Sequence, residues 1–244
     1  MPKIIQVRGI GEPRDRNLLS LMSTQVPNAH VVELPWSAEY GPVPQLLGQA
    51  FMTATAEVPA MLRAELDKGP AFVTAFSGGC VGAGPVIVEG HPNLLGAVFV
   101  ADPMNPDDGS GMFGVAGSRS LPAGVRKLAH PRDMICRCER NSPIRTFSDQ
   151  TAAASLADPF LWAGDIADRI RRNRWQKIVV PWHNPIATYG LYDRAAKAIH
   201  GYLPPPVGLG IHTRYNVDRE NNGLTFLANG ARWIDRQARL KVRT

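Results

Sequence analysis

One serine stands where a buried strand is expected to end and a helix of small residues to begin. Residues 71–85 read AFVTAFSGGCVGAGP, an apolar run that stops just before Ser77 and is followed by two glycines. This pattern is typical of a nucleophile elbow, G-x-S-x-G, with Ala75 in place of the first glycine. The turn that presents such a serine is strained and crowded, so its neighbours have to be small. We therefore expect Ser77 to be a nucleophile, with the N–H of Gly78 stabilising an oxyanion.

Two other interpretations of this segment stay open. It could be a glycine-rich turn that holds an inert serine. Residues 78–82 (GGCVG) also contain a G-x-C-x-G pattern, which would make Cys80 the nucleophile. Glycines suit the end of a sheet strand poorly, and the apolar run stops at Phe76. The elbow is therefore expected at Ser77, with Cys80 one helical turn further on and facing the core.

A serine nucleophile needs a base and an acid that orients the base. In α/β-hydrolases these groups follow the serine in the chain order Ser, Asp, His. Asp133 follows the last of five apolar runs, and His212 precedes the C-terminal helical segment, in what we expect to be an exposed loop. His212 would take the proton of the serine, and Asp133 would orient the imidazole. Asp102 and His183 are the alternative acid and base.

The loop after the first apolar run contains two glycines, Gly9 and Gly11. A loop at the carboxyl end of a central strand lies beside the crevice of an open α/β sheet, and glycines let its backbone approach a ligand closely. A simple tight turn is the alternative. No later glycine completes a dinucleotide-binding fingerprint, so this loop predicts no nucleotide cofactor.

The strands that position these groups are predicted from five apolar runs bounded by Gly, Pro and Asp. They cover residues 3–7, 31–34, 71–76, 95–101 and 124–128. Residues 43–68 carry a helical pattern between the second and third runs, which gives the strand–helix–strand unit of a parallel sheet. The expected fold class is α/β with a central, mainly parallel sheet.

The sequence pattern changes after the fifth run. Residues 152–172 and 188–202 have helical patterns, residues 178–180 could be strand or helix, and a last amphipathic helix is expected over 223–239. The predicted domains are a core over 1–144, a mainly helical insertion over 145–209, and a return to the core over 210–244 that carries the base loop.

Composition narrows the class of protein. The 244 residues are 44% hydrophobic and 20% charged, which is typical of a folded chain and argues against disorder. No apolar run of about 18 residues is present, so no transmembrane segment is expected. The first residues lack the pattern of a signal peptide. The three cysteines are expected to be reduced thiols of a chain made in a cytoplasm, and no Cys/His spacing predicts a metal site.

The formal net charge of +6 permits two interpretations. It could attract an anionic surface, or it could serve solubility alone. The arginines are scattered and no nucleic-acid-binding motif is visible, so no nucleic-acid partner is expected. The sequence does not indicate an oligomeric state.

Three motifs together resemble the cutinase family. Residues 8–12 (RGIGE) resemble its R-G-x-x-E after the first strand, and residues 75–80 (AFSGGC) resemble its G-[YF]-S-Q-G-[AG] elbow. Residues 131–136 (PRDMIC) resemble its G-D-x-[VI]-C acid segment. The resemblance implies a cutinase-type α/β-hydrolase fold with a helical insertion, a serine esterase activity and no cofactor.

The chain departs from the cutinase pattern at three positions. Ala75 replaces the first glycine of the elbow, and Gly78 replaces its glutamine. An oxyanion would therefore rest on the backbone N–H groups of Gly78 and Ile10. His130 stands where a cysteine of the family is expected, so the disulfide around the acid is not available.

Further segments are similar to the lysin B family, the mycolylarabinogalactan esterases of phages that infect mycobacteria and their relatives. These are residues 17–19 (NLL), 37–42 (SAEYGP) and 102–104 (DPM), together with the helical insertion between acid and histidine. The similarity implies hydrolysis of the ester between mycolic acid and arabinogalactan during phage lysis. The enzyme would be made in the host cytoplasm and act on the host envelope.

Four apolar residues are candidates for a surface that binds the acyl chain: Met104, Met112, Phe113 and Trp162. A role in core packing is an equal alternative for each. An alternative function of another class is a non-catalytic envelope-binding or virion protein that reuses the hydrolase fold, because a fold does not determine an activity.

Overall fold

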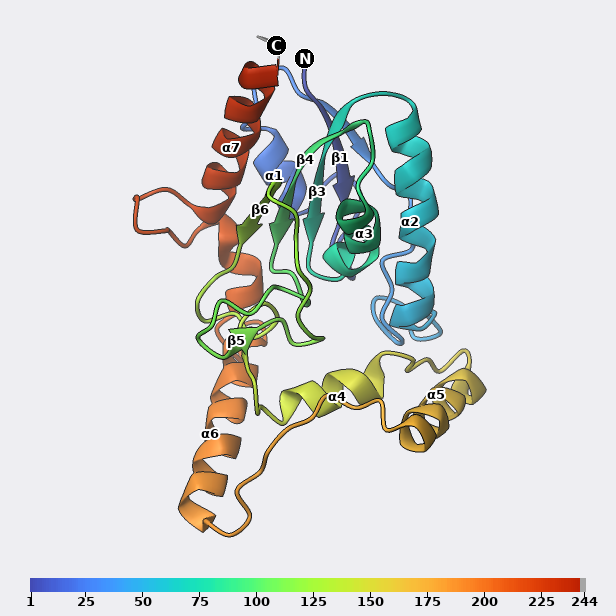
Figure 1. Ribbon diagram of the computed structural model, residues 1–244, viewed down its shortest axis with the longest axis vertical. Helices are drawn as coiled ribbons and strands as arrows, with labels where there is room; N and C mark the ends of the chain where they lie inside the picture. Colours follow the sequence, from blue (N-terminus) through green and yellow to red (C-terminus); the bar gives the residue numbers. More distant parts are fainter. Residues whose placement is uncertain (242–244) are drawn as a thin grey trace.

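A parallel five-stranded sheet lies at the centre of the computed structural model, which describes residues 1–241 (Figure 1). Its strands, in the order β2-β1-β3-β4-β6, are β2 (His30–Glu33), β1 (Lys3–Val7), β3 (Ala71–Phe76), β4 (Leu94–Val100) and β6 (Val125–Leu128). Every neighbouring pair is parallel. The predicted α/β class is confirmed, and each strand lies within one residue of its predicted position.

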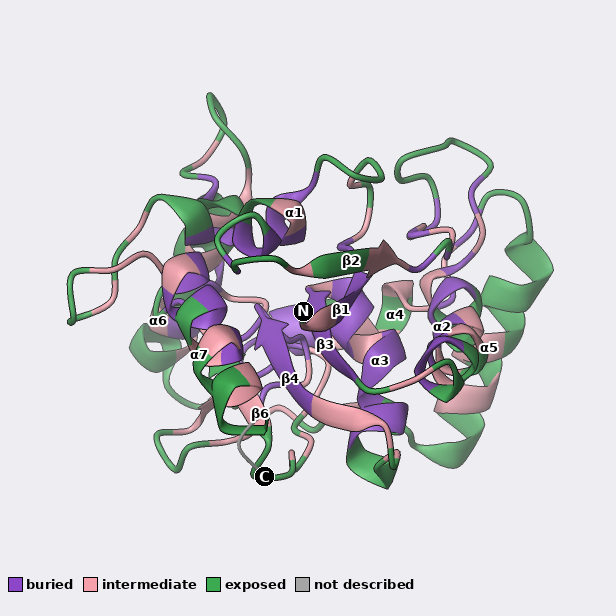
Figure 2. Ribbon diagram, turned by 90° about the horizontal axis from the view of Figure 1, so that it is seen from above, coloured by how far each residue is buried: buried purple, intermediate pink, exposed green. Residues whose placement is uncertain are grey.

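Side chains alternate between the two faces of this sheet, and helices cover both. The helices are α1 (Leu18–Ser23), α2 (Phe51–Asp67), α3 (Gly78–Glu89) and α7 (Phe226–Lys241). Ile5 and Val73 face a core cluster shared with α2 and α3. Phe72 and Val98 face a second cluster shared with α1 and α7. Figure 2 shows the buried central strands β1, β3 and β4 between these helices. Burial of these three strands on both faces explains why their sequences are continuous apolar runs rather than alternating ones.

The prediction of a helix over 43–68 is wrong for the first third of that range. α2 begins at Phe51, and residues 43–50 form turns. Backbone hydrogen bonds in both directions between Tyr40 and Val43 close a tight turn there, and Pro44 has no N–H to donate to a helix. Leu46 and Leu47 are consequently 70% exposed instead of lying on a buried helical face.

The segment between acid and base contains α4 (Ile144–Thr151), α5 (Pro159–Arg172) and α6 (Pro185–Tyr202). The helix predicted over 152–172 begins only at Pro159, because Asp158 caps it by accepting a hydrogen bond from the N–H of Leu161 at 2.8 Å. Residues 178–180 are neither strand nor helix. Among the described residues, no helix is both long and apolar enough to cross a membrane.

A small antiparallel pair that the sequence did not predict anchors this segment to the core. It joins β5 (Met112–Phe113) to β7 (Cys138–Glu139). Arg145 of α4 is 1% exposed and donates hydrogen bonds to the carbonyls of Phe113, Gly114, Cys138 and Glu139. Its guanidinium lies 3.6 Å from the centre of the Phe113 ring. One buried cation therefore ties α4 to both strands.

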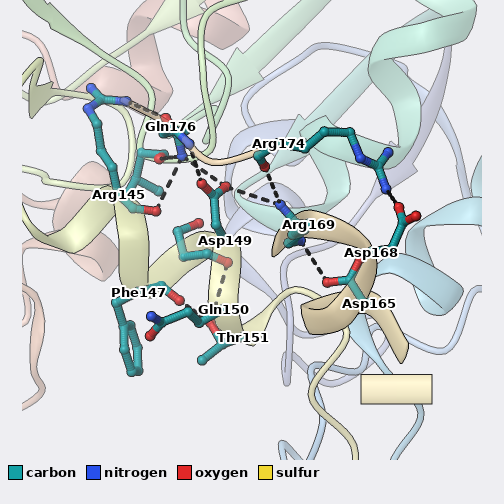
Figure 3. Close-up of polar contacts among 12 residues, drawn as sticks. Arg145, Phe147, Asp149, Gln150, Thr151, Asp165, Asp168, Arg169, Arg174 and Gln176 are labelled. Carbon is teal, nitrogen blue, oxygen red and sulfur yellow. Dashed lines mark hydrogen bonds and ion pairs between the residues drawn. The ribbon is translucent and has the colours of Figure 1, made fainter. Parts of the chain in front are cut away.

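Polar side chains hold α4 and α5 together (Figure 3). Gln176 accepts a hydrogen bond from Arg145 at 3.0 Å, and its backbone N–H donates to Asp149 at 2.6 Å. Arg169 of α5 pairs with Asp165 at 2.7 Å and with Asp149 at 3.6 Å. α5 itself has no buried residue. This part of the molecule is therefore held by charge and hydrogen bonding more than by an apolar core.

Candidate active site

Ser77 lies in a strained turn between β3 and α3. Its backbone has φ 50° and ψ −122°, a left-handed conformation that is costly for a residue with a side chain. The backbone N–H of Ser77 donates to the carbonyl of Val100, and the Ser77 carbonyl accepts from Cys80. The turn is also crowded, because a Cβ added at Gly79 would lie 2.3 Å from the Val7 carbonyl oxygen. These contacts explain why the sequence around the serine is made of small residues.

His212 brings its imidazole to this serine from the 3-10 helix η1 (Ile211–Asn216). Its Nε2 lies 2.8 Å from Ser77 Oγ. The ring stacks on Phe76 at 4.9 Å and contacts Tyr202, the last residue of α6, at 5.2 Å. His212 is 8% exposed, so the expectation of an exposed loop is wrong. Gly210, with φ 60°, turns the chain into η1 and makes this placement possible.

Asp133 completes a chain of hydrogen bonds from the loop that follows β6. Its Oδ2 lies 2.8 Å from His212 Nδ1, and its Oδ1 accepts the N–H of Ile135 at 3.0 Å. Burial alone would raise the pKa of Asp133, but the charge of His212 and the hydrogen bonds from His212, Ile135 and Tyr215 outweigh it and lower the pKa. The carboxyl group is therefore held in its charged form beside the imidazole.

Tyr215 is a site residue that the sequence did not reveal as one. Its hydroxyl donates to Asp133 Oδ2 at 2.8 Å and accepts the N–H of His130 at 3.1 Å. Burial raises the pKa of this phenol well above its usual value, so the hydroxyl stays protonated and remains a donor. Tyr215 follows His212 by three residues, one turn of a 3-10 helix, which is the only sequence signal that places both side chains on one face.

His130 supports this arrangement from the other side. Its ring lies 5.2 Å from Phe226 and 6.1 Å from Tyr215, and its Nε2 is 3.1 Å from Asp218. Burial lowers the pKa of His130 against the opposing effect of Asp218. A neutral imidazole that donates to Asp218 therefore occupies the position at which the cutinase pattern has a cysteine.

Two backbone donors lie next to the serine. Gly78 is the first residue of α3, so its N–H has no acceptor within the helix. The N–H of Ile10 has no hydrogen-bond partner in the described part of the chain, residues 1–241. The two residues are in contact, because a Cβ added at Gly78 would lie 2.7 Å from Ile10 Cγ1. Gly78 and Ile10 are therefore neighbours, and the oxyanion role of their N–H groups stays a prediction.

The loop that carries Ile10 is held by two charged residues. Glu12 accepts the N–H groups of Gly9 and Leu18, each at 2.8 Å. Arg8 is 6% exposed and donates to the carbonyls of Glu12 and Trp36 at 3.0 and 2.8 Å. Burial raises the pKa of Glu12 against the effect of these amide donors. Arg8 and Glu12 of the R-G-x-x-E motif therefore fix the backbone of the loop.

The alternative nucleophile, acid and base have other surroundings. Cys80 is fully buried, and its thiol donates to the Val100 carbonyl at 3.5 Å. Asp102 pairs with Arg119 at 2.9 Å. His183 is exposed in the turn before α6. None of the hydrogen bonds found in residues 1–241 joins these side chains to Ser77.

The four candidates for acyl-chain binding are dispersed. Arg119 donates to the sulfur of Met104 at 3.8 Å, and Trp162 donates through its indole N–H to the Gln150 carbonyl. Phe113 lies under Arg145, as described above. Met112 lines a cavity of about 140 Å³ that Pro131 and Arg132 also border. Their role as a common acyl surface stays a prediction.

Comparison with known proteins gives the following relatives in structure. No protein-family profile and no curated protein sequence matches the chain. Lysin B from Mycobacteriophage D29 is 15% identical with a TM-score of 0.47, over 80% of this chain and 98% of that one. The catalytic core of acetyl xylan esterase from Trichoderma reesei is 12% identical with a TM-score of 0.45, over 67% and 98%. A cutinase-like protein from Cryptococcus sp. is 12% identical with a TM-score of 0.42, over 64% and 96%. Lysin B and cutinase-like proteins, which the sequence motifs resemble, are thus among the structural neighbours.

Proposed function

We propose that this protein is a serine esterase that hydrolyses lipid esters. The observation that carries the proposal is the continuous chain of hydrogen bonds from Ser77 through His212 to Asp133, which starts at a strained turn between strand and helix. A serine, a base and an orienting acid in this geometry are the machinery of acyl transfer.

The first half of the reaction forms an acyl-enzyme. Ser77 Oγ attacks the ester carbonyl while His212 Nε2 takes the hydroxyl proton, and the negative charge of the tetrahedral intermediate lies on the former carbonyl oxygen. The N–H groups of Gly78 and Ile10 stabilise that charge. His212 then gives its proton to the leaving alcohol as the ester bond breaks.

The second half releases the acid. His212 takes a proton from water, the resulting hydroxide attacks the acyl carbon, and the proton returns to Ser77 as the free acid leaves. Asp133 stays ionised throughout and stabilises the imidazolium that forms twice in each cycle, which fits its lowered pKa. Every proton thus passes through Nε2 of His212, and the backbone N–H groups stabilise the oxyanion in both halves of the cycle.

The resemblance of the sequence motifs to those of cutinases and lysin B supports this substrate class. We propose the ester between mycolic acid and arabinogalactan as the natural target, cleaved in the envelope of the host during phage lysis. The enzyme would then be made in the host cytoplasm and reach the envelope once lysis has begun. The leaving group in this reaction is a sugar hydroxyl, and the retained acyl group is a long branched fatty acid.

A short-chain p-nitrophenyl ester assay, combined with a serine-directed phosphonate, tests the proposal. The phosphonate is expected to label the protein once, and Ser77→Ala is expected to remove both labelling and turnover. Circular dichroism of the variant controls for folding. Correctly folded wild-type protein without turnover or label would refute the esterase and favour the non-catalytic envelope-binding alternative.

A further inference from the structure

The helical segment between acid and base exposes an unusual share of apolar side chains. Of the 24 large hydrophobic residues that are exposed in residues 1–241, 14 lie within residues 147–209. Phe160 is 86% exposed, and Ile170 is 66% exposed. Exposed apolar groups gathered in one region mark contact surfaces rather than ordinary solvent-facing surface.

One face of α5 is apolar along its whole length. Phe160, Ala163, Ala167 and Ile170 follow one another at spacings of three or four residues, and all four are exposed. Residues at this spacing lie on the same side of a helix. The opposite side of α5 carries Arg169, which pairs with Asp149 of α4 at 3.6 Å in the polar network drawn in Figure 3. α5 is therefore fixed to the protein by its polar side and presents its apolar side outward.

The turn at residues 43–50 continues this apolar face. Leu46 and Leu47 are each 70% exposed. A hydrogen bond from Ser155 to the Gly48 carbonyl, at 2.7 Å, joins this turn to the segment just before α5, in which Leu156 is 54% exposed. Figure 1 shows the turn at the lower end of α2, next to the loop that leads into α5.

A positive cluster stands at the carboxyl end of the same helix. Arg171, Arg172 and Arg174 all pair with a single carboxylate, Asp168, and all three are more than half exposed. Three cations on one anion leave two positive charges beside the apolar face. We call the combined surface the α5 patch. It consists of Leu46, Leu47, Leu156, Phe160, Ile170, Arg171, Arg172 and Arg174.

The α5 patch is continuous with the rim of the candidate active site. Tyr40 and Phe51, which flank the turn, stack at 4.8 Å, and Tyr40 also bonds Thr151 at 2.7 Å. Phe51 contacts the elbow, since a Cβ added at Gly78 would lie 3.0 Å from its ring. The segment from Tyr40 to Phe51 therefore borders the oxyanion donors on one side and carries the exposed Leu46 and Leu47 on the other.

We propose that the α5 patch docks the protein on a lipid layer with anionic headgroups. Exposed aromatic and aliphatic side chains enter the boundary between headgroups and acyl chains, and neighbouring arginines pair with negative headgroups. The proposal deepens the proposed function, because a long-chain ester lies in such a layer and the patch sets Ser77 beside it.

Binding is measured on the full-length Ser77→Ala protein, which cannot consume lipid by the proposed chemistry. Sedimentation with vesicles of phosphatidylcholine and phosphatidylglycerol is compared with sedimentation with pure phosphatidylcholine vesicles. We expect strong binding to the mixed vesicles that weakens as salt is raised, and weak binding to the neutral ones.

Two variants remove the two components of the α5 patch. Phe160→Ser lowers the partition coefficient on mixed vesicles about tenfold, because an aromatic ring no longer enters the layer. Arg171→Glu with Arg172→Glu lowers it more than about tenfold and removes the preference for anionic lipid. The matched controls are Val88→Ser on α3 and Arg232→Glu with Arg236→Glu on α7, all exposed and outside the patch, and they keep wild-type binding.

Docking and catalysis can fail separately in these measurements. Turnover of a soluble p-nitrophenyl ester by Phe160→Ser, made with Ser77 intact, stays at the wild-type level. Absence of sedimentation with both vesicles overturns the proposal, whatever the esterase assay gives. Equal loss of binding in the α7 control overturns it as well. A concentration-dependent dimer that Phe160→Ser dissociates would show instead that a second copy of the chain covers this face.

Discussion

The sheet edge that carries Ser77 and the helical segment with α4 to α6 are held together in different ways. Asp133 and the fully buried Tyr215 lie in an apolar core, and their polar atoms pair with one another. α5 has no buried residue and is joined to α4 by polar contacts such as the ion pair of Arg169 with Asp149. The site thus has fixed geometry, as acyl transfer requires. The helical segment is built to present surface, and its main contribution to the site is one ring, Tyr202.

The strongest test of this comparison is loss of the base. His212→Ala is expected to lower kcat by about four orders of magnitude with the fold intact, because members of such a triad act as a unit. His183→Ala is the matched control from the helical segment. Its side chain is exposed, so both rate and stability should stay close to the wild type. Measurement of kcat for both variants, with circular dichroism as the control for folding, shows which histidine is the base. An active His212→Ala beside a folded but inactive His183→Ala would move the catalytic centre towards α6.

Loosening the helical segment should affect substrate size more than chemistry. Arg145→Met leaves the carbonyls of Phe113, Gly114, Cys138 and Glu139 without their donor, which costs about 2–3 kcal/mol of stability. Turnover of a palmitate ester should fall about tenfold, while turnover of a butyrate ester should change little, because a covering segment acts on long chains.

Thermal unfolding and the two ester assays, run below the melting transition, test this expectation. Arg137→Met is a suitable control, because that arginine pairs with Asp108 at the surface and holds no buried carbonyl. Equal losses on butyrate and palmitate in a folded Arg145→Met protein would show that the helical segment also positions the triad.

Tyr215→Phe should have a smaller effect and a characteristic pH dependence. The variant loses one hydrogen bond to the charged Asp133, so kcat/KM should fall about tenfold. That bond helps to lower the pKa of Asp133, and its loss therefore raises this pKa. A carboxylate that no longer shares its charge with the phenol also holds the protonated form of His212 more strongly, and that form cannot accept the serine proton, so the acid limb of the pH–rate profile should move to higher pH.

The pH dependence of the stability of the fold should change in the same direction. Because the pKa of folded Asp133 lies below its usual value, its charge stabilises the fold above the unfolded pKa of about 3.9. That contribution is lost as the pH falls through the folded pKa, and in Tyr215→Phe it is smaller and lost at higher pH. Tyr192→Phe, a change at an exposed tyrosine of α6, serves as the control. An unchanged acid limb in Tyr215→Phe would show that Tyr215 only fills space.

The sequence predicted the part of the molecule in which local pattern and tertiary contact agree. Strands β1 and β3 are buried on both faces, so their apolar runs are unmistakable, and the small residues after Ser77 reflect contacts that forbid a Cβ. Tyr215 was missed because its partner, Asp133, is 82 residues away and the 3-10 helix that aligns it has no strong sequence signal. The turn at 43–50 was missed because Leu46 and Leu47 fit the spacing of a buried helical face, although both are exposed in the structure.

The smallest expected effect belongs to Cys80, the residue that competes with Ser77 for the role of nucleophile. Burial, followed by the charge of Asp102, raises the pKa of its thiol well above the usual value, so almost no thiolate is present. Cys80→Ala should therefore keep turnover within about twofold of the wild type and cost about 1 kcal/mol of stability, because it leaves only a small cavity. Iodoacetamide should not inactivate the folded protein, because the thiol is fully buried and protonated. Inactivation through Cys80, together with an active Ser77→Ala, would mean that Cys80 rather than Ser77 is the nucleophile. The strained backbone argues against this outcome, since the left-handed turn lies at Ser77, while Cys80 already lies within α3.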